Sequence, residues 1–116
     1  MAEYKAVFHI DEMGKWGLLL SNVKNLLDAV DVGSVHIEVV ANSEAVKNYD
    51  KHQVSNPDRR MMVSLSSRGV RFAACNNALT GQDISENDLM DFVEVVPAGV
   101  LELVVKQHAG YAYLKP

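Results

Sequence analysis

Residues 70–77 read Val70-Arg71-Phe72-Ala73-Ala74-Cys75-Asn76-Asn77, which is a short apolar strand followed by a polar turn. Cys75 is the one cysteine among the 116 residues, and it stands where the strand gives way to the turn. A cysteine thiolate is a strong nucleophile, and no other side chain in this sequence offers comparable reactivity at neutral pH. The stretch therefore predicts a strand that presents a candidate reactive thiol at its end.

Strand and helix patterns alternate along the rest of the chain. The apolar, β-branched segments that predict strands cover residues 6–10, 35–41, 70–75, 92–96 and 111–115. The segments that predict helices cover residues 15–31, 44–49, 57–68 and 100–108, with helical turns at 76–79 and after residue 85. Five such alternations predict an α/β fold with three layers, a mostly parallel sheet and right-handed crossovers.

Two segments carry finer predictions. His36 and Glu38 share one face of the second strand, so this strand is expected near an edge of the sheet or under a charged helix. The last helix, residues 100–108, is apolar nearly all round. Such a helix is expected to be buried on more than one side, and its excess apolar surface predicts an interface with another chain.

Composition excludes several classes of protein. The formal net charge is −4 and the acids and bases are interspersed, so there is no basic stripe for nucleic acid. No apolar run approaches the roughly 20 residues of a membrane-spanning helix. A lone cysteine and the absence of a signal-peptide pattern predict a cytoplasmic location. With no repeat or linker in the sequence, we expect a single domain over residues 1–116.

The carboxyl ends of parallel strands form one rim, where open α/β sheets bind ligands. The candidate site residues at or near this rim are His9, Asp11, Glu12, Asn42, Ser43, Cys75, Asn76, Asn77, Pro97 and Gly99. The histidines have no spacing typical of zinc, and the glycines form no phosphate-binding motif, so we expect neither a metal nor a cofactor. A cluster of His9, Asp11 and Cys75 that forms a metal site or a nucleophile site is a less favoured alternative.

Five stretches together resemble a known family. They are VFHID at 7–11, IEVVAN at 37–42, GVRFAACNNAL at 69–79, VPAGVLEL at 96–103 and QHAGYAYLKP at 107–116. The chain resembles the DsrE/DsrF-like group of small proteins linked to intracellular sulfur oxidation and sulfur relay. The resemblance implies a three-layer α/β/α sandwich with a five-stranded sheet, assembled as a homotrimer or a homohexamer. It also implies that Cys75 carries a persulfide between a donor and an acceptor protein.

The physical argument for Cys75 is independent of that resemblance. A thiol at the junction of a strand and a helical turn lies near backbone N–H groups, which favour the thiolate. No Lys, Arg or His adjoins Cys75 in the sequence, so His9, the turn backbone or a second subunit would have to supply further stabilisation. The opposing interpretation is an inert core cysteine, because free cysteine is among the most buried residue types.

Three functions remain open from the sequence. The preferred one is a sulfur carrier that uses Cys75 without a bound cofactor. The second is a module that binds a small molecule at the rim between Asn42, Cys75 and Gly99. The third is an oligomeric interaction protein with an unreactive cysteine. The reactivity of this one thiol distinguishes them.

Overall fold

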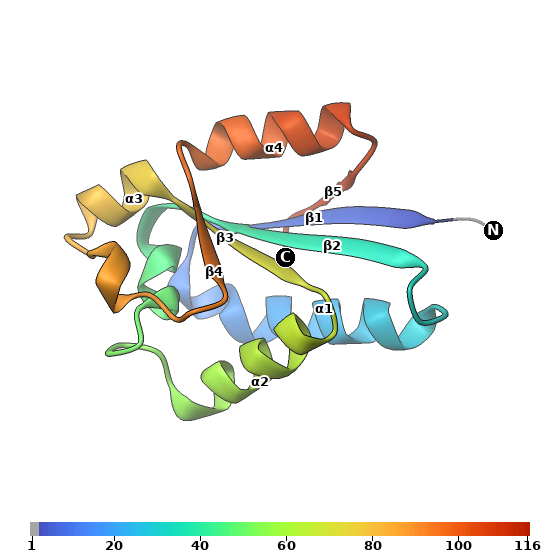
Figure 1. The fold of residues 1–116 in the computed structure, drawn as a ribbon, viewed down its shortest axis with the longest axis horizontal. Coiled ribbons are helices and arrows are strands. Elements are labelled where there is room, and N and C mark those ends of the chain that lie inside the picture. The colour runs from blue at the N-terminus through green and yellow to red at the C-terminus, as the bar shows by residue number, and fades with distance from the viewer. Residues whose placement is uncertain (1–2) are drawn as a thin grey trace.

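The computed structural model describes residues 3–116, and the strands of this range form one sheet (Figure 1). The strands are β1 (Tyr4–Ile10), β2 (Val35–Ala41), β3 (Arg71–Cys75), β4 (Val93–Val96) and β5 (Ala112–Leu114). Their order in the sheet is β4-β3-β2-β1-β5, and every pairing is parallel. The predicted five-stranded parallel sheet is therefore confirmed.

Helices cover both faces of the sheet, which confirms the three-layer α/β/α prediction. The α-helices are α1 (Trp16–Ala29), α2 (Asn56–Ser67), α3 (Asn76–Gly81) and α4 (Gly99–His108). The 3₁₀ helices are η1 (Met13–Lys15), η2 (Ser43–Tyr49) and η3 (Glu86–Asp88). Figure 1 shows α1 and α2 on one face of the sheet and α4 on the other. No helix of residues 3–116 is long and apolar enough to cross a membrane.

The larger core lies between the sheet and helices α1 and α2. Aromatic side chains run through it in sequence, with ring centroids 5.3 Å apart for Trp16 and Tyr49 and 6.2 Å apart for Tyr49 and Phe72. Phe72 meets Phe92 at 5.5 Å. Buried Trp16 donates its indole N–H to the carbonyl oxygen of Ala45 at 3.0 Å, which joins α1 to η2. These tilted aromatic contacts are the favourable arrangement for neighbouring rings.

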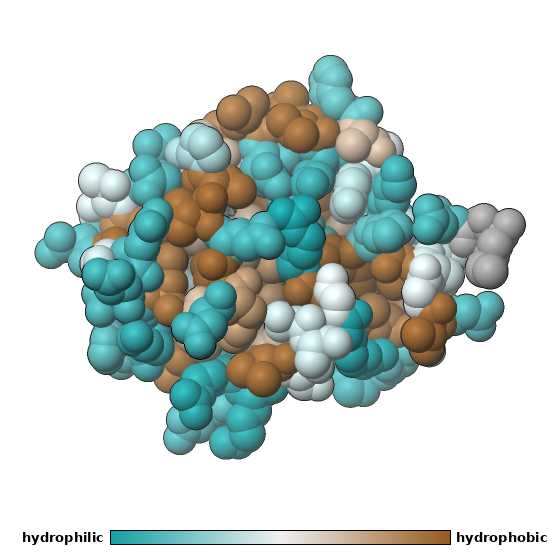
Figure 2. Space-filling model, viewed as in Figure 1, coloured by the Kyte–Doolittle hydropathy of each residue, from teal (hydrophilic) through white to brown (hydrophobic). Residues whose placement is uncertain are grey.

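The core under α4 is smaller, because a single helix covers that face. Its buried residues are Val7, Val40, Ala73 and Leu103. The outward side chains of α4 are exposed, and they are Val100, Leu101, Val104 and Val105. Figure 2 shows the resulting apolar patch over α4 at the top of the molecule. The prediction that this helix is buried on more than one side is wrong for the single chain, since only one of its sides faces the sheet.

The second strand corrects another prediction. β2 lies between β1 and β3 at the centre of the sheet, not near an edge. Glu38 on β2 is 1% exposed and lies 3.5 Å from Lys106 Nζ of α4. The alternative of a strand under a charged helix is therefore the correct one. The central position of β2 could not be predicted from the sequence, because Glu38 and His36 resemble the polar face of an edge strand.

The remaining predicted elements are present with shifted bounds. The predicted helix over residues 44–49 is the 3₁₀ helix η2, in which backbone N–H groups bond three residues back. The helical turn expected at 76–79 extends to Gly81 as α3. Ser55 caps α2 by accepting a hydrogen bond from the backbone N–H of Asp58 at 3.2 Å, which explains where this helix begins.

Candidate functional site

Three neighbouring strands bring three of the predicted residues to one side of the sheet. Side chains alternate between faces along a strand, so His9 shares the face of Val7, and Cys75 that of Ala73. Both Val7 and Ala73 belong to the core under α4. Asn42 follows β2 directly and extends the same face. His9, Asn42 and Cys75 therefore come from β1, the end of β2 and β3, on the side that α4 covers.

A hydrogen-bonded chain fixes two of these side chains. The ring of His9 bonds through Nε2 to Asn42 Oδ1 at 3.1 Å and through Nδ1 to the hydroxyl oxygen of Tyr113 at 2.6 Å. Because an amide oxygen can only accept, Nε2 carries the proton. Nδ1 of a neutral ring then accepts the hydroxyl proton of Tyr113. The His9 tautomer is thus set by partners on two other segments of the chain.

Cys75 is the last residue of β3 and the N-cap of α3, and it is 7% exposed. Gly99, the first residue of α4, packs directly on it. A Cβ at position 99 would lie 3.2 Å from the Cβ of Cys75 and 3.3 Å from the Cβ of Asn42. These distances are tighter than most Cβ contacts, so a side chain at position 99 would force its neighbours to shift by a few tenths of an ångström. Cys75, Asn42 and Gly99 form one packed cluster.

The other predicted site residues lie around this cluster without joining it. Asn76 and Asn77 are exposed in the first turn of α3, and Pro97 is exposed before α4. Asp11 turns towards the C-terminal segment, where its Oδ2 lies 3.1 Å from Lys115 Nζ. The hydrogen bond and charge of Asp11 raise the pKa of Lys115. The structure thus joins His9, Asn42, Cys75 and Gly99, and leaves Asp11 with a different partner.

Sequence reasoning missed Tyr113 and Lys115. Both belong to the last segment, and β5 pairs with β1 so that Tyr113 lies opposite Val7 and Leu114 opposite Phe8. A signal was present, because residues 111–115 were expected to form a strand. The neighbour of that strand in the sheet was not predictable from its local pattern. The pairing with β1 is what places Tyr113 beside His9.

A second polar cluster lies under α4, towards the middle of the sheet. Glu38 is buried, and its Oε1 lies 3.4 Å from Arg71 Nη1 and 3.5 Å from Lys106 Nζ. Neither carboxylate oxygen has a hydrogen-bond partner among the described residues. Burial, followed by the neighbouring Glu102 carboxyl, raises the pKa of Glu38 to about 7, and the two cations oppose this shift. This cluster was not predicted as a site.

The chemistry that the rim offers is that of a single thiol. Within residues 3–116, no group of three or more His, Cys, Asp or Glu side chains is placed to hold a metal ion. Cys75 carries the one thiol of the sequence, and Gly99 packs against both Cys75 and Asn42, whose amide is hydrogen-bonded to His9. The arrangement suits an exchange of sulfur at one atom, since that reaction requires a thiolate and an approaching partner only.

Comparisons with known proteins agree with this fold. A model of the DsrE/DsrF-like family matches residues 5–116. The protein of unknown function MTH1491 from Methanobacterium thermoautotrophicum is 39% identical, with a TM-score of 0.87, covering 98% of this chain and 100% of that one. No curated protein matches the chain.

Two further solved structures are similar in fold at lower identity. The ychN protein from E. coli is 20% identical with a TM-score of 0.77, and 100% of both chains is covered. The conserved protein of unknown function BT1422 from Bacteroides thetaiotaomicron is 15% identical with a TM-score of 0.72, covering 97% of this chain and 94% of that one. Since the family model spans nearly all of the sequence and the sheet has the same architecture, the chain belongs to the DsrE/DsrF-like family.

Proposed function

We propose that this chain carries sulfane sulfur as a persulfide on Cys75 and passes it to a partner protein. The observation that carries the proposal is the position of the only cysteine, at the carboxyl end of an inner parallel strand and packed against Gly99, the first residue of α4. Such rims are where open α/β sheets bind their ligands. Membership in the DsrE/DsrF-like family supports a sulfur-relay type of protein in general.

The proposed exchange is balanced without a cofactor. The Cys75 thiolate attacks the outer sulfur of a donor persulfide, the donor S–S bond breaks, and the donor leaves as a thiolate. Cys75 then holds the sulfur until an acceptor thiolate attacks the same atom and releases the Cys75 thiolate. No electrons are gained or lost overall. Because Cys75 is only 7% exposed, it would hold a persulfide away from water and small thiols between the two steps.

The same burial favours a second candidate function. An unreactive cysteine in an oligomeric interaction protein would also be buried, and the apolar outer side of α4 offers a surface for assembly. A homotrimer or homohexamer is compatible with either function. The rim pocket required by the small-molecule alternative gains no support, because Gly99 fills the space against Cys75 and Asn42.

Intact-mass spectrometry of the native protein tests the sulfur-carrier proposal. After incubation with polysulfide as the donor, the wild-type chain should gain the mass of one sulfur atom, and the Cys75→Ser variant should gain none. No adduct on the folded wild-type protein, or an equal adduct on the variant, would overturn the proposal. Iodoacetamide labelling of folded and denatured protein distinguishes the sulfur carrier from the interaction protein with an unreactive cysteine. In the interaction protein, Cys75 should be alkylated only after denaturation.

A matched pair of histidine variants tests the surroundings of the thiol. His9→Gln breaks the hydrogen-bonded chain to Asn42, whereas His36→Gln changes an exposed ring that lies 3.3 Å from Glu3 and away from the rim. We expect slower persulfide loading of Cys75 in the first variant and wild-type loading in the second. Equal rates in both would assign the activation of Cys75 to the turn backbone or to a second subunit.

A further inference from the structure

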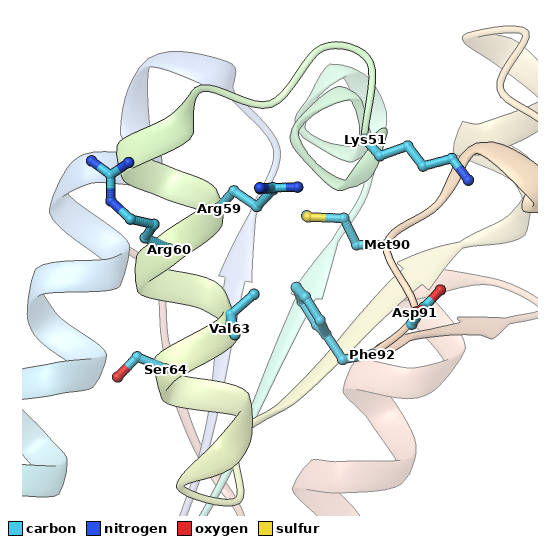
Figure 3. Close-up of a pocket in the computed structure, with 8 residues that line it drawn as sticks. All are labelled: Lys51, Arg59, Arg60, Val63, Ser64, Met90, Asp91 and Phe92. Carbon is cyan, nitrogen blue, oxygen red and sulfur yellow. The ribbon is translucent and has the colours of Figure 1, made fainter.

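A pocket of about 580 Å³ lies between α2 and the segment that leads into β4. This volume falls within the range of about 300–1,000 Å³ that small-molecule sites occupy. Figure 3 shows the side chains of Val63, Met90 and Phe92 facing the same space from α2 and from the segment before β4. Met90 is 7% exposed and Val63 is 51% exposed, so the apolar wall runs from the core to the surface.

Cations border this apolar wall. Lys51, Arg59 and Arg60 line the pocket, and Figure 3 shows the Arg59 side chain pointing towards Met90, whereas the Lys51 side chain extends away from Arg59 at the edge of the pocket. None of the three forms an ion pair with a carboxylate in residues 3–116. Asp91 is the one acidic residue of the lining, so positive charge is in excess there. The whole chain is acidic, with a net charge of −4, which makes this local excess notable.

We propose that this pocket binds a small amphipathic anion, in which one phosphate, sulfonate or carboxylate group is joined to an apolar or aromatic body. The acidic group would lie at the Arg59 guanidinium, which forms charge-assisted and often paired hydrogen bonds with oxyanions, and Lys51 would add positive charge at the edge of the pocket. The body would cover Met90, Phe92 and Val63. The pocket lies on the α2 face of the sheet, whereas Cys75 packs against α4, so this proposal does not depend on the sulfur-carrier function.

Two fluorescent dyes of the same shape test the proposal. Anilinonaphthalene sulfonate has a sulfonate on an aromatic body, and phenylnaphthylamine is its uncharged analogue. The double variant Lys51→Gln, Arg59→Gln should weaken binding of the sulfonate about tenfold, since each exposed charge pair contributes a few-fold in affinity. It should leave the uncharged dye unaffected. Lys15→Gln, an exposed cation outside the pocket, should change neither affinity.

The apolar wall is tested with two equally exposed valines. Val63→Ser should weaken both dyes, whereas Val104→Ser on the outer side of α4 should weaken neither; each valine is 51% exposed, so both variants should fold. The proposal is overturned if the double variant binds the sulfonate as the wild type does, or if Val104→Ser is the variant that loses the dye. Equal competition by inorganic phosphate, which has no apolar body, would also overturn it.

Discussion

Replacing Glu38 by Gln is the perturbation whose effect on stability follows most directly from this fold. Glu38 lies at the centre of β2 and is 1% exposed. Its pKa is raised from the ordinary 4.5 to about 7, first by burial and then by the Glu102 carboxyl. Lys106 and Arg71 act in the opposite direction, because each places a cation within 3.5 Å of the carboxylate. Gln has nearly the same shape and does not titrate.

The sign of the pH dependence follows from proton linkage. Between pH 4.5 and about 7, the folded protein keeps the Glu38 proton that the unfolded chain has already released. The free energy of unfolding therefore falls as the pH rises through this interval, by at most about 1.4 kcal/mol per pH unit. Over the whole interval, this single carboxyl should cost about 3 kcal/mol of stability. Below the interval, Glu38 is neutral in both states and contributes no pH dependence.

Urea denaturation from pH 4 to pH 8 checks this prediction, with the fluorescence of buried Trp16 as the probe of unfolding. The difference in unfolding free energy between wild type and Glu38→Gln should change by about 3 kcal/mol across the interval, in favour of the variant at high pH. Contributions that are common to both proteins cancel in this difference. Glu12→Gln, at an exposed carboxyl, serves as the control and should run parallel to the wild type. Parallel curves for Glu38→Gln would refute the reasoning.

Three further predictions concern the rim and α4. Gly99→Val should lower the free energy of unfolding by about 2 kcal/mol, because a Cβ at position 99 already lies 3.2 and 3.3 Å from two side chains. Gly17 has open space around it, so Gly17→Val, the control, should lower the free energy of unfolding by less in urea denaturation. Tyr113→Phe removes the hydroxyl that bonds His9 and should cost about 1 kcal/mol; an unchanged urea midpoint would contradict this. Leu101→Glu should shift sedimentation of an assembled protein towards the monomer, and an unaltered species would exclude this side of α4 as the interface.

The types of element and their order were predictable because they depend on local pattern. The alternation of strand and helix identified the parallel sheet, and the run that ends at Cys75 is a strand as predicted. Parallel strands bring their carboxyl ends to one rim, so the sequence alone led us to expect Asn42 and Cys75 at the same edge. The structure confirms the fold and shows that both residues pack against Gly99; the reactivity of Cys75 stays a prediction.

Other features depended on contacts between distant parts of the chain. Tyr113 reaches His9 because β5 returns beside β1, and no local pattern specifies that pairing. Glu38 resembled a residue of a half-exposed strand, yet Arg71 and Lys106 lie beside it in the interior. The exposed side of α4 likewise followed from there being one helix on its face of the sheet.

The sequence by itself determined the order of strands and helices, the parallel sheet and a single cysteine at its rim, because hydrophobic period and turn residues act over a few neighbouring positions. Only the tertiary structure decided which polar groups meet there, the pKa of Glu38 and the pocket between α2 and β4. Each of these is set by atoms that are close in space and far apart along the chain, since burial and charge depend on every neighbour within a few ångströms.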